Sequence, residues 1–213
     1  MSHPVTLAAA GPPLKQARGA VVMLHGRGGS AQDVLSLAGT LRQVDVAYIA
    51  PQAPLRTWYP RSFLAPLEHN EPFLSRSLET VGAIVGDLAG RGIASDRVAF
   101  IGFSQGGCLA VEFAARNARR YGGVAALSAG LIGPPGLARD DRGSLAGTPV
   151  FLGCSDIDPH IPLDRVHVTA RVLTAMNAAV TERIYPGMGH TINQDEIAHV
   201  RRLLERLDGA PAA

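Results

Sequence analysis

The chain has 213 residues, of which 46% are hydrophobic and 18% charged, a composition typical of a folded globular protein. We predict a single domain over residues 1–213, because one α/β domain can reach this length. The net charge of +2 is too weak to indicate nucleic-acid binding. The N-terminus has no basic segment followed by an apolar run, and no stretch approaches the roughly 18 apolar residues that span a membrane, so we expect a cytoplasmic protein.

Strand-like and helix-like segments alternate along the chain, which is typical of a parallel sheet with helices on both faces. Strands are expected at 20–25, 46–50, 97–101, 124–128, 150–153 and 183–185. Helices are expected at about 31–42, 74–90, 105–117, 162–179 and 193–207. The strand at 20–25 is a continuous apolar run, which indicates burial on both faces of a mostly parallel sheet.

The segment 51–72 interrupts this alternation. Its prolines, at positions 51, 54, 60, 66 and 72, disfavour regular structure, while Trp58, Tyr59 and Phe63 argue against disorder. A long irregular segment in a compact domain is usually functional or disordered. We predict that the three aromatic residues form one wall of a substrate pocket, with packing in the core as the alternative.

A Gly-x-Ser-x-Gly motif with Ser104 at its centre stands directly after an expected strand and directly before an expected helix. In this context the motif is typical of the nucleophile elbow of the α/β-hydrolase fold, where a tight turn exposes the serine hydroxyl. The N-terminus of the following helix also favours negative charge beside the serine. We predict that Ser104 is a nucleophile.

A serine nucleophile needs a base, and the base needs an acid to orient it. Of the seven histidines, His190 is the candidate, because it follows the last strand in a Gly-rich loop at the sheet edge where the serine turn is expected. The acid should lie between them in chain order, where Asp156 and Asp158 follow one strand. We choose Asp158, since Pro159 fixes a turn behind it, and expect Asp156 to hydrogen-bond the loop backbone.

Two backbone N–H groups should stabilise the oxyanion of a tetrahedral intermediate. The first belongs to Gln105, the residue after the nucleophile, and the second to Arg27 in the loop 25–29. The glycines of that loop do not form a phosphate-binding pattern, which argues against a nucleotide. Cys108 and Cys154 are the only cysteines and have no metal-ligand spacing, although a disulfide between them stays open.

Together these motifs resemble the carboxylesterase/lysophospholipase family of small α/β hydrolases, which includes the acyl-protein thioesterases. The matching segments span almost the whole chain in the family's order, at 24–28, 51–59, 102–107, 158–162 and 185–190. The resemblance implies a mostly parallel α/β-hydrolase sheet with a minimal cap, and no metal or organic cofactor. It also implies Ser104, Asp158 and His190 as the catalytic triad, with the Arg27 and Gln105 N–H groups as the oxyanion hole.

We therefore expect a serine carboxylesterase that hydrolyses small to medium carboxylic esters through an acyl-enzyme, with a small-molecule ester as its partner. Arg27 stands where thioesterase-like members carry an apolar residue, and the segment 60–75 is polar, which favours small esters over long-chain lipids. Arg27 and Arg61 are candidates to meet an anionic group of the substrate.

Three alternatives to this function remain open. They are a lysophospholipase or acyl-thioesterase, a lactone hydrolase, and a non-catalytic ligand-binding protein of the same fold. The apolar helices expected at 162–179 and 193–207 are also compatible with a homodimer.

Overall fold

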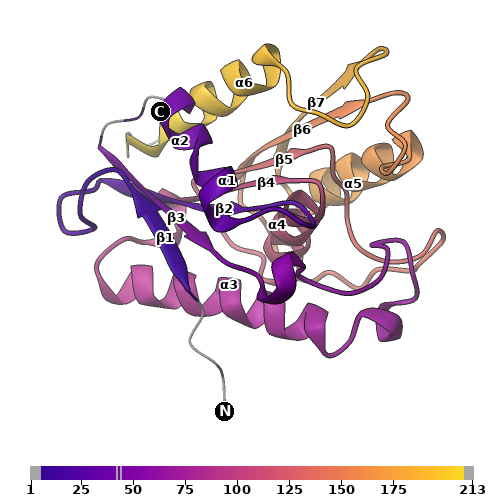
Figure 1. Ribbon diagram of the computed structural model, residues 1–213, viewed down its shortest axis with the longest axis horizontal. Coiled ribbons are helices and arrows are strands. Elements are labelled where there is room, and N and C mark those ends of the chain that lie inside the picture. Colours follow the sequence, from indigo (N-terminus) through magenta and orange to yellow (C-terminus); the bar gives the residue numbers. More distant parts are fainter. Residues whose placement is uncertain (1–5, 42, 44, 209–213) are drawn as a thin grey trace.

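The computed structural model describes residues 6–41, 43 and 45–208. A seven-stranded sheet runs through the molecule in the order β1-β3-β2-β4-β5-β6-β7 (Figure 1). β1 is antiparallel to β3, and every other neighbouring pair is parallel, as predicted for a mostly parallel sheet. The strands are β1 (Leu7–Ala10), β2 (Gly19–Leu24), β3 (Val46–Pro51), β4 (Val98–Phe103), β5 (Gly123–Leu127), β6 (Pro149–Ser155) and β7 (Ala179–Tyr185).

Helices cover both faces of this sheet (Figure 1). One face carries α3 (Phe73–Gly90), α4 (Gln105–Arg116) and α5 (Leu163–Ala175), and the other carries α1 (Ala31–Leu35), α2 (Leu37–Leu41) and α6 (Gln194–Glu205). Short 3-10 turns lie at Pro54–Arg56, Leu67–Asn70, Ser95–Arg97 and Arg206–Asp208. Within the described ranges, no helix is long and apolar enough to cross a bilayer.

The structure corrects the sequence prediction at three elements. β1 was not expected, because its Leu-Ala-Ala-Ala sequence has little strand propensity. The helix expected over 31–42 is divided at Ser36, whose N–H bonds the carbonyls of Gln32 and Val34. The helix expected over 162–179 ends at Ala175, because Asn177 adopts a left-handed φ of 61° and the chain then enters β7 four residues earlier than expected.

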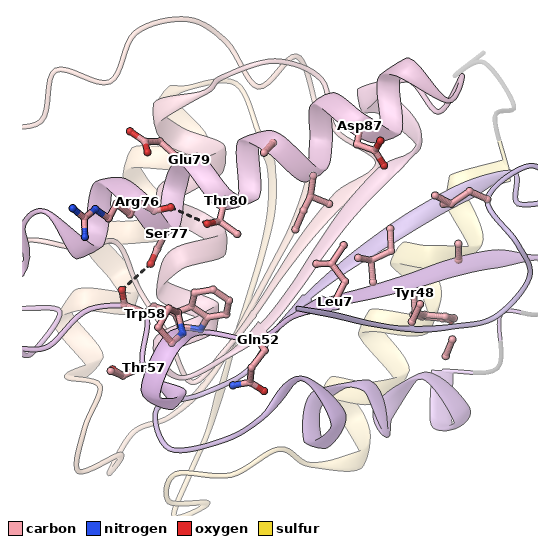
Figure 2. Close-up of a pocket in the computed structure, with 18 of the residues that line it drawn as sticks. Leu7, Tyr48, Gln52, Thr57, Trp58, Arg76, Ser77, Glu79, Thr80 and Asp87 are labelled. Carbon is pink, nitrogen blue, oxygen red and sulfur yellow. Dashed lines mark hydrogen bonds between the residues drawn. The ribbon is translucent and has the colours of Figure 1, made fainter. Parts of the chain in front are cut away.

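The antiparallel edge strand β1 forms one wall of a groove of about 1500 Å³, and α3 forms the facing wall (Figure 2). The floor includes Thr57 and Trp58 from the irregular segment after β3. Ser104, Asp158 and His190 do not line this groove. This groove is therefore distinct from the place where the sequence predicts chemistry.

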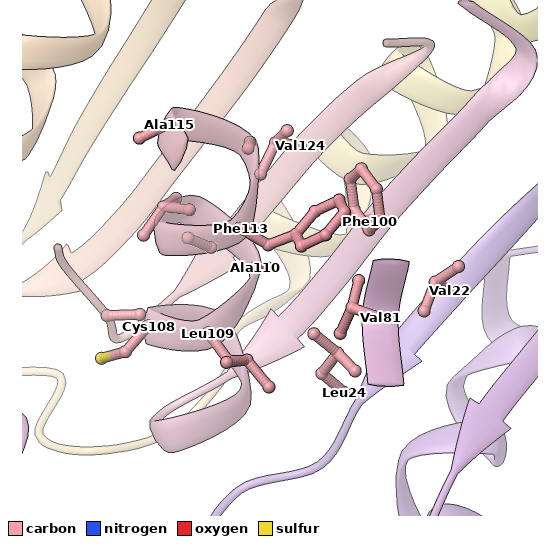
Figure 3. Close-up of a cluster of buried hydrophobic side chains, with 14 of the residues drawn as sticks. Val22, Leu24, Val81, Phe100, Cys108, Leu109, Ala110, Phe113, Ala115 and Val124 are labelled. Atoms are coloured by element: carbon pink, nitrogen blue, oxygen red, sulfur yellow. The ribbon is translucent and has the colours of Figure 1, made fainter. Parts of the chain in front are cut away.

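The central strand β4 is buried on both faces, which makes it a rigid base for the residue at its end. Val98 and Phe100 pack into the core under α3 and α4, whereas Ala99 and Ile101 pack into the core under α1, α2 and α6. The Phe100 ring lies 5.4 Å from that of Phe113 on α4 (Figure 3). This two-sided packing carries the chain to Ser104 with little freedom.

Candidate active site

Ser104 forms the turn between β4 and α4 and has a strained backbone, with φ of 54° and ψ of −123°. A side-chain-bearing residue rarely adopts this conformation, and such strain is concentrated at functional sites. Two hydrogen bonds hold it in place. The Ser104 N–H donates to the Leu127 carbonyl at 2.9 Å, and the Ser104 carbonyl accepts from the Cys108 N–H at 2.9 Å.

The glycines of the motif let α4 approach the sheet closely. A Cβ on Gly106 would overlap the carbonyl oxygen of Leu24 in β2, and one on Gly102 would overlap the backbone of Gly106. Any larger residue at these two positions would push the helix N-terminus away from the strands. The spacing of the motif therefore has a steric cause in this fold.

His190 and Asp158 come together from the loops after β7 and β6. The imidazole Nδ1 lies 2.7 Å from Asp158 Oδ2, and the Asp158 side chain is fully buried. Burial alone would raise the pKa of Asp158, but hydrogen bonds from His190 and from the backbone N–H groups of His160 and Ile161 outweigh it, so the pKa lies below its ordinary value. An ionised Asp158 only accepts, so Nδ1 carries the proton and Nε2 keeps its lone pair.

The imidazole of His190 lies beside the serine turn. Its ring centroid is 4.8 Å from that of Phe103, the residue directly before Ser104, and also 4.8 Å from that of His160. Among the described residues, Ser104 Oγ makes no hydrogen bond to His190. Catalytic hydrogen bonds are often long in a free enzyme and shorten when substrate binds.

The loop that carries His190 is fixed by two side chains at the end of β6. Asp156 Oδ1 accepts from the Gly187 N–H at 2.8 Å, so Asp156 bonds the backbone of the loop after β7, whereas the sequence prediction assigned it to the backbone of its own loop. Ser155 Oγ accepts from the Gly189 N–H at 3.1 Å, a contact that sequence reasoning did not find. The β6 end therefore orients both the imidazole and its loop.

Arg27 comes to Ser104 from the loop after β2, whereas Gln105 directly follows Ser104 in the chain. A Cβ on Gly26 would lie 3.5 Å from Ser104 Cβ, so the loop 25–29 packs directly against the serine. In that loop the N–H of Gly28 donates to Arg56 and that of Gly29 to Gly26, whereas the Arg27 N–H makes no backbone hydrogen bond among the described residues. Gln105 begins α4, where N–H groups lack helical partners.

His25 joins the loop 25–29 to the turn after β3. Its Nε2 accepts from the Ala53 backbone N–H at 3.1 Å, so the other nitrogen, Nδ1, carries the proton and donates to the Gly26 carbonyl at 2.8 Å. Burial lowers the pKa of His25 below its ordinary value. A neutral His25 with both nitrogens engaged serves to hold the loop.

The three aromatic residues of the irregular segment are buried. Trp58, Tyr59 and Phe63 are 2%, 1% and 7% exposed and belong to the core under α3 and α4. The indole N–H of Trp58 donates to the His25 carbonyl at 2.8 Å, which ties the aromatic segment to the loop 25–29. Their contact with a substrate stays a prediction.

The two cysteines are buried in the core and have no role in the proposed chemistry. Cys108 and Cys154 are both free thiols, and burial raises the pKa of each to about 12, which makes them poor nucleophiles. The disulfide left open by the sequence is therefore absent. Across the ranges that the structure describes, no group of three or more His, Cys, Asp and Glu residues could hold a metal ion.

The sheet order and the strained serine at a strand-to-helix turn define an α/β hydrolase. The sequence matches the model of the phospholipase/carboxylesterase family over residues 8–207, and the chain belongs to this family. Membership supports the hydrolysis of esters or thioesters.

Relatives and solved structures agree with this assignment. The chain is 26% identical to acyl-protein thioesterase 1 of Saccharomyces cerevisiae, over 91% of this chain and 94% of the relative. It is similar to the crystal structure of a phospholipase/carboxylesterase from Dyadobacter fermentans, with a TM-score of 0.92 and 44% identity over 96% of this chain and 98% of the other. The crystal structure of esterase PE8 has the same fold, with a TM-score of 0.79 at 24% identity and coverage of 95% and 99%.

Proposed function

We propose that this protein is a serine carboxylesterase that hydrolyses small to medium carboxylic esters through an acyl-enzyme. One observation carries the proposal. The strained Ser104 and the hydrogen-bonded pair of Asp158 and His190 lie at the same edge of the sheet, and the His190 imidazole packs 4.8 Å from the ring of Phe103, the residue before Ser104. Family membership independently favours ester chemistry.

The reaction has two steps. Ser104 Oγ attacks the ester carbonyl while His190 Nε2 accepts its proton, and the N–H groups of Arg27 and Gln105 hold the oxyanion. His190 then protonates the leaving alcohol. In the second step His190 takes a proton from water, which attacks the acyl-enzyme. His190 then gives this proton to Ser104 Oγ as the bond to the acyl group breaks and the carboxylic acid leaves. Asp158 holds the imidazole in the required tautomer and stabilises its charged form.

The rim near this edge favours small, polar substrates. An open pocket of about 610 Å³ is lined by Arg61, Ser62, Ala65 and His69, and Arg61 and His69 are exposed. The Arg61 carbonyl accepts from the Arg27 guanidinium at 2.7 Å, so this pocket adjoins the loop 25–29. Burial of a long acyl chain would require apolar surface that these residues do not supply.

Acyl-thioester hydrolysis is the second candidate. It is favoured by the likeness to a yeast protein named acyl-protein thioesterase over 91% of the chain. The same nucleophile and base would serve, with a thiol in place of the alcohol as leaving group. Chain-length preference distinguishes the two candidates, because a palmitoyl-type substrate needs a long apolar channel.

The experiment compares p-nitrophenyl esters from acetyl to palmitoyl in the wild type, Ser104→Ala and the control Ser75→Ala, which removes a hydroxyl from α3. We expect fastest turnover of short chains, loss of activity by at least about 10³-fold in Ser104→Ala, and no change in Ser75→Ala. A fluorophosphonate probe should label the wild type and not Ser104→Ala. Fastest turnover of long chains would favour the thioesterase or lysophospholipase function. A wild type that neither turns over nor labels would instead indicate a ligand-binding protein.

A further inference from the structure

The two residues proposed to supply the oxyanion hole also share a partner through their side chains. The partner is the segment 57–61, here called the brace, which follows the turn after β3 and lies between the loop 25–29 and the first turn of α4. From one side, the Arg27 guanidinium donates to Thr57 Oγ1 at 3.0 Å, to the Pro60 carbonyl at 3.1 Å and to the Arg61 carbonyl at 2.7 Å. It also lies 5.9 Å from the centre of the Tyr59 ring.

From the other side, the Gln105 side chain holds the brace by three hydrogen bonds. Its Oε1 accepts from the Trp58 backbone N–H at 3.0 Å and from Thr57 Oγ1 at 3.2 Å, and its Nε2 donates to the Tyr59 carbonyl at 2.8 Å. A backbone N–H can only donate and a backbone carbonyl can only accept, so the orientation of the amide is determined. Gln105 is 5% exposed, so these bonds are shielded from water.

The Thr57 hydroxyl forms hydrogen bonds with the side chains of both oxyanion residues. The hydroxyl oxygen accepts a hydrogen bond from the Arg27 guanidinium. Its single proton is shared between two acceptors, Gln105 Oε1 at 3.2 Å and the Tyr59 carbonyl oxygen at 3.0 Å. A continuous chain of hydrogen bonds therefore runs from Arg27 through Thr57 to Gln105. Both oxyanion N–H groups belong to the residues at the ends of this chain.

The brace is itself anchored to the body of the protein. The Trp58 carbonyl accepts from Ser77 Oγ on α3 at 2.7 Å, as Figure 2 shows beside Thr57. The Gly28 N–H donates to the Arg56 carbonyl at 2.8 Å, immediately before the brace. Leu55 and Arg56 have φ of 51° and 59°, so the chain enters the brace through two residues in the left-handed region.

From this arrangement we propose that the Thr57 hydroxyl is a positioning group, which sets the separation of the Arg27 and Gln105 N–H groups and hence the geometry of the oxyanion hole. The proposal rests on the proposed hydrolase function. A backbone donor is unaffected by mutation of its own side chain unless that side chain holds the backbone in place. Here the side chains of Arg27 and Gln105 both bond a shared hydroxyl, that of Thr57.

The test replaces Thr57 by valine, which keeps the branched shape and removes the hydroxyl, and by serine, which keeps the hydroxyl. For p-nitrophenyl acetate we expect Thr57→Val to lower kcat by about 10-fold with KM within about 2-fold, because a small misplacement of catalytic groups is costly. Thr57→Ser should restore kcat to within about 2-fold of the wild type. The control is Thr80→Val on α3, whose hydroxyl donates to the Arg76 carbonyl of its own helix.

A second readout reports the oxyanion hole directly. A trifluoromethyl ketone adds to the serine and places an oxyanion in the hole, whereas the carboxylic acid product does not. In Thr57→Val the ketone should bind about 10-fold more weakly, while inhibition by the product is unchanged. If Thr57→Val proves unstable, Arg27→Met and Gln105→Met each remove one end of the chain and should weaken the ketone in the same way.

The inference is overturned if Thr57→Val keeps both the kcat and the ketone affinity of the wild type, if only KM changes, or if Thr57→Ser is as impaired as Thr57→Val. These outcomes are separable from failure of the proposed function. A wild type that hydrolyses no ester and binds no ketone refutes the function itself. An active wild type with an unaffected Thr57→Val refutes the positioning role alone.

Discussion

The site has an acid–base side, formed by His190 and Asp158, and an oxyanion side, formed by the loop 25–29 and the start of α4. On the acid–base side, one hydrogen bond of 2.7 Å joins His190 Nδ1 to Asp158 Oδ2, and two further hydrogen bonds hold the His190 loop. On the oxyanion side, the proposed donors are backbone N–H groups, and side chains hold that backbone through the brace at 57–61. The acid–base side thus depends on the identity of two side chains. The oxyanion side depends on a network, in which each member should carry a smaller share.

The largest loss of kcat is expected at Asp158, because no other side chain can take its place beside His190. Asp158→Asn keeps an oxygen for the N–H groups of His160 and Ile161 but turns an amide N–H₂ toward His190, which then favours the tautomer with its proton on Nε2. By analogy with the well-studied serine protease triad, kcat should fall by about 10⁴-fold. The measurement is kcat for p-nitrophenyl acetate, with the exposed Asp164→Asn as control. A loss below about 10-fold would assign the orienting role elsewhere.

The next prediction concerns how the free energy of unfolding depends on pH through a buried carboxyl group, that of Glu196. Glu196, in the first turn of α6, is fully buried against β6, and its Oε1 has no hydrogen-bond partner in the described part of the chain. Burial raises the pKa of Glu196 from 4.5 to about 7. Between these two pH values the folded protein binds more protons than the unfolded chain, so the free energy of unfolding should fall as pH rises, by roughly 2–3 kcal/mol, and level off above pH 7.

Glu196→Gln removes this titration, and its side-chain oxygen can still accept from the N–H of Asn193, which caps the N-terminus of α6. Urea unfolding of the wild type, Glu196→Gln and the exposed control Glu205→Gln at pH 5, 6, 7 and 8 measures the effect. The fall in stability with pH should be smaller in Glu196→Gln than in the other two proteins. Parallel curves for all three would show that Glu196 ionises normally.

A smaller loss of kcat is expected from a change at Trp58, on the oxyanion side. Trp58→Phe keeps an aromatic ring in the core and removes the N–H that donates to the His25 carbonyl. Because other contacts still hold the loop 25–29, kcat should fall by only about 3- to 10-fold. Tyr121→Phe, which removes a hydrogen bond to the Asn117 carbonyl, is the matched control. A changed KM and chain-length preference in Trp58→Phe would instead support the predicted contact between Trp58 and the substrate.

The same contrast explains which features the sequence could predict. The serine turn, the loop of His190 and the choice of Asp158 follow from short segments, whose glycines, prolines and order along the chain have local physical causes. The brace does not follow from any segment, because Thr57 meets Gln105 across 48 positions and Arg27 across 30. Such contacts depend on how the loops after β2 and β3 pack beside α4. The edge strand β1 is similar, since pairing with β3 overrides the weak strand propensity of its alanines.

The smallest loss of kcat is expected at Asp156, because Ser155 also holds the loop of His190 by a hydrogen bond. Asp156→Ala loses the hydrogen bond to the Gly187 N–H, whereas Asp156→Asn can keep it through Oδ1. Ser155 still holds Gly189, so kcat should fall by only about 3-fold in Asp156→Ala and stay near wild type in Asp156→Asn. Equal losses in both variants would mean that the charge of Asp156, rather than its hydrogen bond, supports His190. A loss in Asp156→Ala as large as that in Asp158→Asn would mean that the imidazole is held by both carboxylates together, and the acid–base side would then be a network like the oxyanion side.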